Sequence, residues 1–447
     1  MLDLPRLGVM TAEPGTSPHI MVWALCEAFR RIGVRVQRFL SRANFSSSRD
    51  AAWGVGESPR HLDSWLMTPE ACRALFVYGS RAADLALVQG SLSSSEEDGG
   101  QIMPLCEWLD LPRLIVLDVN RLEQCRLPDL PPDADGLLLD GVRDDRHGAR
   151  LATNLEALLG LPVVGVLDAM PELRAALASL PAGERVPSVL LRQLGDRLSR
   201  SWRPEKILQW ADRRPLPLPT CSWLPGGSAR QCKLTVAIAY DDAFHCYFPD
   251  TFDLLELQGA TVIDFSPLRD EHLPPQADVV VFGCGCPDKY ASLLSENHCM
   301  MAALRSHLCA GRRIYAEGGG VAYLCREIEL QPGEFRRMAG ILPALARRLR
   351  EPLPSVPVEV RLARPAWLGP IGTLLRGYSI PQWQFLPDGA NHAGGDSTLD
   401  GQVLGDFQVV GSPLHLHFAA NPNYLKHLFY PERNHQDAPD GLAIRPR

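Results

Sequence analysis

Short apolar runs alternate with longer amphipathic segments along most of the chain, and this alternation restricts the fold more than any other feature. In the first half, RLGVM (6–10), LPRLIVLDV (111–119) and LPVVGVL (161–167) are rich in Val, Leu and Ile. Continuous apolar runs of this length, separated by helical patterns, are typical of parallel strands that helices cover on both faces. The pattern predicts a doubly wound, mainly parallel α/β sheet.

The same alternation begins again after a stretch rich in Pro and Gly. LTVAIAY (234–240) and ADVVVFGCG (277–285) are again apolar runs separated by helical patterns. A chain of 447 residues is also too long for one hydrophobic core. We therefore predict a first domain at 1–211, a linker at 212–233, a second domain at 234–430 and a mobile tail at 431–447.

The composition narrows the classes of function. The net charge is −7, and Lys and Arg do not cluster with aromatic residues, which disfavours nucleic-acid and anionic-membrane partners. No apolar run approaches the roughly 18 residues of a membrane-spanning helix. The twelve Cys lack the spacing of a disulfide framework. We expect a cytoplasmic protein with reduced thiols, without membrane or nucleic-acid partners.

One segment predicts a functional turn. In RRIYAEGGGVAYL (312–324), an apolar run ends at Glu317, three glycines follow, and a helical pattern begins. A strand, a tight turn and a helix in this order typically present one reactive side chain at the tip of the turn. The tip here is Gly318, which has no side chain to present.

Several segments together resemble a known family. VAIAYDDAFHCYFPDTFDLLELQGATVIDF (236–265), VFGCGCPD (281–288) and SPLHLHFAANP (412–422) resemble the glutamine amidotransferase domain of cobyrinic acid a,c-diamide synthase. RHLDSWLM (60–67) and GLLLDGVRDDRH (136–147) extend the resemblance into the first half. It implies a P-loop NTPase-like domain, similar to dethiobiotin synthetase, followed by a flavodoxin-like class I glutamine amidotransferase domain.

The resemblance also implies a chemistry. In that family, a Cys on the elbow attacks glutamine and releases ammonia. The first domain uses Mg-ATP to activate carboxylates of a tetrapyrrole precursor in cobalamin biosynthesis, and ammonia converts them to amides.

The glutaminase residues of the family are altered here. The resemblance places the nucleophile at Gly318, between Glu317 and Gly319, and a hydrogen atom cannot form the glutamyl thioester. The partner imidazole corresponds to His415, which we interpret as a retained core histidine. The oxyanion-binding loop of the family corresponds to Gly283, Cys284 and Gly285, with Cys284 in place of a glycine.

The ATP-binding residues are altered as well. The phosphate loop of the family corresponds to a segment without Lys, in which the loop residues are Gly15, Thr16 and Ser17. A P-loop needs that Lys for the β- and γ-phosphates. Gln89 stands where the family has an acidic residue, so we expect neither ATP nor Mg²⁺ as a cofactor. Asp63 is retained, and its expected role is to cap a helix.

Three hypotheses follow. The first is a pseudoenzyme that acts as a tetrapyrrole-binding, regulatory or partner subunit, with a protein partner or a second copy of itself. The second is an amide ligase that uses free ammonia, for which ATP and Mg²⁺ would be needed. The third is a metal-binding protein. Alternate residues of a strand share a face, so the two cysteines of C-x-C and the two histidines of H-x-H could each converge on one ion. Its ligands would be Cys284, Cys286, His415 and His417.

Overall fold

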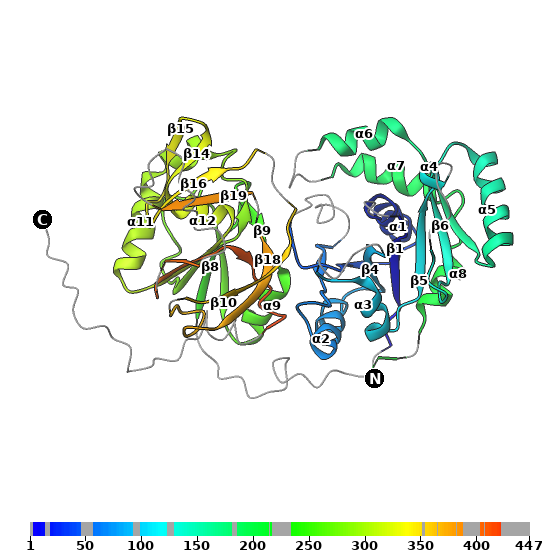
Figure 1. The fold of residues 1–447 in the computed structure, drawn as a ribbon, viewed down its shortest axis with the longest axis horizontal. Helices are drawn as coiled ribbons and strands as arrows, with labels where there is room; N and C mark the ends of the chain where they lie inside the picture. The colour runs from blue at the N-terminus through cyan, green and yellow to red at the C-terminus, as the bar shows by residue number, and fades with distance from the viewer. Residues whose placement is uncertain are drawn as a thin grey trace, which may run out of the picture.

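Two α/β halves lie side by side, the first at the right of Figure 1 and the second at the left. The structure is a computed structural model that describes most of both halves. The described residues are 3–13, 18–45, 57–92, 99–122, 129–180, 186–213, 215–216, 234–350, 354–363, 365–380, 382–387, 403–405 and 407–421. The predicted tail and most of the predicted linker lie outside these residues.

The first half is built on a seven-stranded parallel sheet with the order β3-β2-β4-β1-β5-β6-β7. All six residues of the strand β1 are buried, which explains its continuous apolar run. The strands are β1 (Arg6–Thr11), β2 (Val36–Leu40), β3 (Arg60–His61), β4 (Leu85–Ser91), β5 (Arg113–Asp118), β6 (Gly136–Val142) and β7 (Val163–Asp168).

Helices cover both faces of this sheet. One face packs against α2 (Pro69–Gly79), α3 (Ile102–Leu109) and α5 (Asp145–Leu159). The other face packs against α1 (His19–Arg31), α6 (Pro171–Ser179), α7 (Ser188–Leu198) and α8 (Pro204–Ala211). The short helix α4 (Val119–Leu122) follows β5.

Local signals begin and end these helices. The Thr68 hydroxyl accepts the Ala71 N–H at 3.2 Å at the start of α2, where Pro69 is the first helical residue. Asp144 accepts the His147 N–H at 2.8 Å at the start of α5. That helix ends at Gly160, whose positive φ suits glycine.

The second half has a six-stranded sheet with the order β10-β8-β11-β13-β21-β20, in which only the edge strand β20 is antiparallel among the described strands. Its strands are β8 (Thr235–Ala239), β10 (Thr261–Phe265), β11 (Val279–Phe282), β13 (Arg313–Glu317), β20 (Leu404–Gly405) and β21 (Val409–Ser412). The helix α9 (Pro249–Leu257) covers one face. The other face packs against α10 (Ala291–Glu296), α11 (His298–Cys309) and α12 (Gly319–Leu324). The predicted fold class is confirmed.

Three small sheets extend the second half. Their orders are β12-β9, β15-β14-β16-β19 and β17-β18-β22. The strands are β9 (Phe244–Cys246), β12 (Cys284–Gly285), β14 (Cys325–Gln331), β15 (Glu334–Arg337), β16 (Leu342–Arg348), β17 (Pro357–Arg361), β18 (Leu374–Ser379), β19 (Trp383–Pro387) and β22 (Leu414–His415).

A buried hydrogen bond joins the two halves. The Tyr378 hydroxyl in β18 donates to Asp63 Oδ2 at 2.6 Å and accepts the Gly100 N–H at 2.8 Å. Asp63 Oδ1 accepts the N–H groups of Trp65 at 2.9 Å and Leu66 at 3.0 Å. Asp63 therefore caps a turn rather than a helix, and its second oxygen reaches the other half.

An ion pair and an aromatic stack also join the two halves, and we refer to this line of contacts as the seam. Arg60 in β3 contacts Asp250 Oδ1 at 2.5 Å and Asp253 Oδ2 at 2.7 Å, both in α9. The rings of Phe45 and Phe248 stack with centroids 4.5 Å apart. These contacts place the end of β3 against the start of α9.

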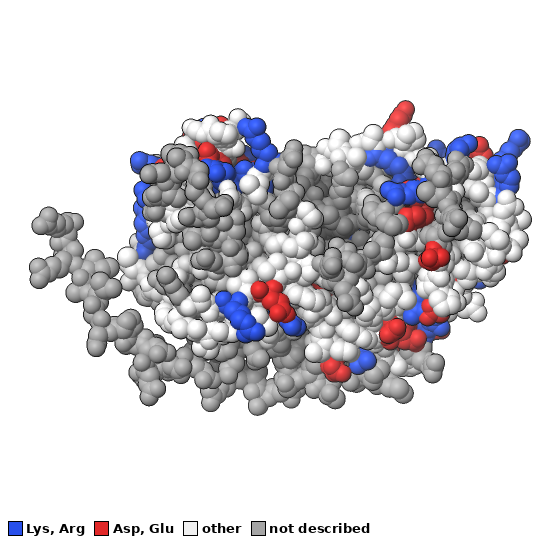
Figure 2. All heavy atoms as spheres, in the orientation of Figure 1, with Lys and Arg blue, Asp and Glu red and all other residues white. Residues whose placement is uncertain are grey.

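The charged side chains of the surface are mixed in sign. On the described part of the face in Figure 2, Lys and Arg lie close to Asp and Glu, and uncharged surface separates these groups. Within the described chain, no helix combines the length and the apolarity that crossing a bilayer requires.

We expect Tyr378→Phe to lower the free energy of unfolding by about 1–3 kcal/mol, because it leaves the buried Asp63 carboxylate and the Gly100 N–H each short of one partner. Urea denaturation measures the change. Tyr78→Phe is the matched control, since Arg81 lies over its ring, and phenylalanine keeps that ring. An equal effect of both substitutions would contradict the role of the hydroxyl.

Candidate functional site

The elbow of the second half has the predicted strand–turn–helix form. The strand β13 ends at Glu317, Gly318 forms the turn, and α12 begins at Gly319. Gly318 has φ +48°, where glycine is favoured over residues with a Cβ. A Cβ on Gly318 would lie 2.7 Å from Cys284 Sγ and 3.0 Å from Ile380 Cγ2. The space in front of the elbow is therefore filled by the Cys284 side chain.

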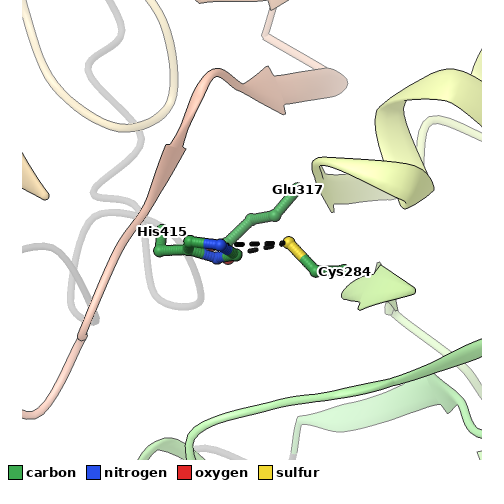
Figure 3. A group of neighbouring side chains, drawn as sticks. All are labelled: Cys284, Glu317 and His415. Carbon is green, nitrogen blue, oxygen red and sulfur yellow. Dashed lines mark hydrogen bonds and ion pairs between the residues drawn. The ribbon is translucent and has the colours of Figure 1, made fainter. Parts of the chain in front are cut away.

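Three buried side chains converge beside this turn, as Figure 3 shows. Cys284 Sγ lies 3.2 Å from His415 Nδ1, and the same nitrogen lies 3.5 Å from Glu317 Oε2. The three side chains come from β12, β13 and β22, at the ends of three separate strands. We refer to Cys284, Glu317 and His415 as the elbow cluster.

Neighbouring groups hold Glu317 in place. The Tyr315 hydroxyl donates to Glu317 Oε1 at 2.6 Å, and the Leu416 N–H donates to the same oxygen at 3.1 Å. These two hydrogen bonds fix the carboxylate and leave Oε2 directed at His415.

The electrostatics of the cluster favour a neutral thiol. Burial raises the pKa of Cys284 well above its ordinary range, and the neighbouring Glu317 carboxylate raises it further. Since the thiolate is the nucleophilic form, a thiol in this setting is a weak nucleophile.

The four proposed metal ligands do not come together. Cys284 and His415 lie in the elbow cluster, whereas Glu317 takes the place next to them. His417 lies beside Asp250, with its Nε2 3.7 Å from Oδ2, and its ring packs 4.6 Å from Phe248. Cys286 borders the adjacent cavity outside the cluster.

A cavity of about 250 Å³ lies between the two halves, next to the cluster. Side chains of both halves line it: Phe45, Ser58, Pro59 and His61 come from the first, and Tyr240, His245, Cys246, Tyr247, Pro249, Phe252, Cys284, Gly285, Cys286, Ile380, Gln382 and His415 from the second. Most of this lining is apolar or aromatic, as in small-molecule sites.

His61 is the most unusual side chain of this lining. It is 1% exposed, and neither ring nitrogen has a hydrogen-bond partner among the described residues. Burial, followed by the neighbouring His417, lowers the pKa of His61 to about 3. Its ring packs edge-on against Phe45 and Phe248, at centroid distances of 5.3 and 5.0 Å. His61 is not among the site residues predicted from the motifs, although it lies two residues from Asp63 in the segment RHLDSWLM.

In the first half, the predicted phosphate loop at Gly15, Thr16 and Ser17 lies outside the described residues. Directly before it, Glu13 is buried, and its Oε1 accepts the Asp118 N–H at 3.2 Å. Burial raises the pKa of Glu13. Gln89, at the predicted position of a lost acid, is buried in β4.

Comparison with known proteins bears on this site. Residues 235–423 match the CobB/CobQ-like glutamine amidotransferase domain. The cobyrinate a,c-diamide synthase of Syntrophotalea carbinolica is 29% identical, over 94% of this chain and 97% of that protein. The Salmonella typhimurium synthase of the same name is 28% identical, over 92% and 95%. The hydrogenobyrinate a,c-diamide synthase of Streptomyces coelicolor is 27% identical, over 94% and 96%. These matches confirm the resemblance that the motifs predicted.

We expect the buried His61 to make stability depend on pH. Its pKa is lowered on folding, so its contribution is fully present above about pH 6.5 and is lost as the pH falls towards 3. Between pH 7.5 and 5, this amounts to about 2 kcal/mol. His61→Leu removes that part of the pH dependence, which chemical denaturation at pH 7.5 and 5 measures.

His298→Leu is the control, because His298 is an exposed histidine at the start of α11. It should keep the pH dependence of the unchanged protein. If His61→Leu kept it too, His61 would not be the titrating group.

Proposed function

We propose that this chain, a homologue of the cobyrinate a,c-diamide synthases along nearly its whole length, binds a tetrapyrrole precursor without hydrolysing glutamine. It would serve as a carrier, regulatory or partner subunit. The observation that carries the proposal is the filled space in front of Gly318.

The position of the nucleophilic thiol of a glutaminase is altered. The resemblance places the nucleophile at residue 318, but a Cβ there would lie 2.7 Å from Cys284 Sγ. Real Cβ atoms do not approach a neighbour so closely, so a side chain at residue 318 would require the Cys284 sulfur to move. The chain has the side chain of residue 284 and lacks that of residue 318.

Cys284 is a poor replacement for the missing nucleophile. Its thiol is kept neutral by burial and by Glu317. In a thiol–imidazole–carboxylate triad, the nucleophile and the carboxylate use opposite ring nitrogens. Here Cys284 Sγ and Glu317 Oε2 are both nearest to His415 Nδ1, at 3.2 and 3.5 Å, and the sulfur lies 3.8 Å from Nε2. This arrangement does not support proton transfer from the thiol through the imidazole to the carboxylate.

Glu13 argues against ATP as a second reagent. Its carboxylate is buried at the carboxyl end of β1 and is held by the Asp118 N–H. Asp118 ends β5 and lies opposite Asp140 in β6, and Arg174 pairs with Asp140. A triphosphate at this edge would meet acidic groups and no P-loop Lys.

The relatives suggest the ligand class, since they are named for cobyrinate and hydrogenobyrinate. The cavity of about 250 Å³ lies at the small end of ligand pockets, which measure about 300–1,000 Å³. A tetrapyrrole would therefore insert one edge between the two halves instead of being enclosed. The aromatic rings of Phe45, Tyr247 and Phe252 offer it flat apolar contacts.

Isothermal titration tests the binding. We expect cobyrinic acid or sirohydrochlorin to bind with a dissociation constant in the micromolar range, and Mg-ATP to give no binding heat. Phe45→Ala should weaken tetrapyrrole binding at least about tenfold, which is 1.4 kcal/mol. Phe407→Ala, at an exposed ring outside the cavity lining, is the control. Mg-ATP binding, or no tetrapyrrole binding tighter than millimolar, would contradict the proposal.

Ammonia release tests the loss of the glutaminase. The unchanged protein should release no ammonia from glutamine above background, and Gly318→Cys should not restore it, because Cys284 occupies the space. The double variant Gly318→Cys with Cys284→Gly clears that space and should gain glutamine hydrolysis. Hydrolysis by the unchanged protein that Cys284→Ser abolishes would identify Cys284 as a nucleophile and end the proposal.

A further inference from the structure

We propose that the elbow cluster, Cys284, Glu317 and His415, binds one divalent transition-metal ion of the Zn²⁺ class. The proposal concerns the described side chains alone and does not depend on tetrapyrrole binding.

The spacing of the ligand atoms suits such an ion. The three atoms lie within 4.8 Å of one another, with 3.2 Å between Cys284 Sγ and His415 Nδ1 and 3.5 Å from that nitrogen to Glu317 Oε2. Tetrahedral Zn²⁺ with bonds of about 2.0–2.3 Å separates its ligand atoms by about 3.3–3.6 Å. The two printed separations at Nδ1 lie within a few tenths of an ångström of these values, and the sulfur, which also lies 3.8 Å from Nε2, would turn towards the ion on binding.

The convergence on one nitrogen fits metal ligation better than acid–base catalysis. The thiol and the carboxylate are both nearest to His415 Nδ1, although the sulfur also lies 3.8 Å from Nε2, and a cation among the three groups would contact all of them. A buried carboxylate is stabilised by a positive charge, and a cation that binds the thiol displaces its proton. A divalent cation supplies that charge.

Hydrogen bonds around the cluster orient one of the proposed ligands. Glu317 Oε1 is held by Tyr315 and Leu416, which leaves Oε2 for the ion. Such second-layer hydrogen bonds orient ligands in metalloproteins. Cys284 and His415 also border the cavity. Three protein ligands with a fourth position on a cavity are typical of zinc sites that bind water or substrate.

His61 is an independent observation that points to a ligand here. It lines the same cavity, is 1% exposed, and has no hydrogen-bond partner for either ring nitrogen among the described residues. Buried polar groups without partners are costly, and they commonly mark a missing ligand. A water or ligand atom at the fourth position of the ion would approach the cavity that His61 borders.

Cobalt titration of the metal-stripped full-length protein tests the site. We expect one Co²⁺ per chain, a thiolate-to-cobalt charge-transfer band, and displacement of Co²⁺ by Zn²⁺. Elemental analysis after dialysis against Zn²⁺ should give one zinc per chain. No tetrapyrrole, ATP or glutamine is present, so the result stands apart from the function proposed above.

Variants locate the ion. Loss of a supporting hydrogen bond typically weakens metal binding by about 10–100-fold, so loss of a ligand should cost at least about 100-fold. Cys284→Ser should remove the charge-transfer band, and His415→Gln and Glu317→Gln should weaken binding while the band persists at saturating Co²⁺. Cys284→Ala is the second cysteine variant if the serine variant misfolds. Cys26→Ser, at a buried thiol in α1, is the matched control and should bind as the unchanged protein does.

Two results would overturn the assignment. One is the absence of both stoichiometric metal and the charge-transfer band in the unchanged, folded protein. The other is a band that disappears in Cys286→Ser or His417→Gln but survives in Cys284→Ser. The latter result would place the site at Cys286 or His417 and exclude Glu317 as a ligand.

Discussion

The hydrogen bond from Tyr378 to Asp63 is the contact on which the relation of the two halves depends. Asp63 is fully buried, and a buried carboxylate is tolerated only when its oxygens are paired. Three of its partners lie in the first half, and the fourth is Tyr378 in the second. A Cβ on Gly100 would lie 2.7 Å from the same carboxylate, so the packing around it is close. The ion pair of Arg60 with Asp250 and Asp253 adds a second contact between the halves, from β3 to α9.

Gly318 and Cys284 form the second constraint. The turn at Gly318 keeps the backbone of an elbow, and the sulfur of Cys284 fills the volume that a side chain there would need. The thiol thus lies beside His415, but it enters from the β12 loop instead of from the elbow. As a result, the sulfur and the Glu317 carboxylate are both nearest to the same ring nitrogen, Nδ1. A cysteine, a histidine and a glutamate can form a nucleophilic site, and in this arrangement they are suited to bind a cation.

Much of the fold was predictable, and less of the site. The buried strands β1, β5, β7, β8 and β11 lie in the apolar runs, because complete burial removes the need for polar alternation. Gly318 and His415 were found from the motifs. The pairing of Cys284 with His415 joins residues 131 positions apart, and no local pattern encodes such a contact. His61 was missed because an isolated histidine carries no periodic signal.

The sequence by itself determined the two parallel α/β sheets, the glycine at the elbow and the missing Lys in the phosphate loop, because these depend on residue type at one position or on local periodicity. Only the tertiary structure decided which ligands meet. Alternation along a strand predicted that His415 and His417 share a face, but β22 ends at His415, and His417 turns to Asp250. Likewise β12 ends at Gly285, before Cys286. Glu317 joins Cys284 and His415 because strands of three different sheets meet beside the elbow, which is a property of packing and not of any one segment.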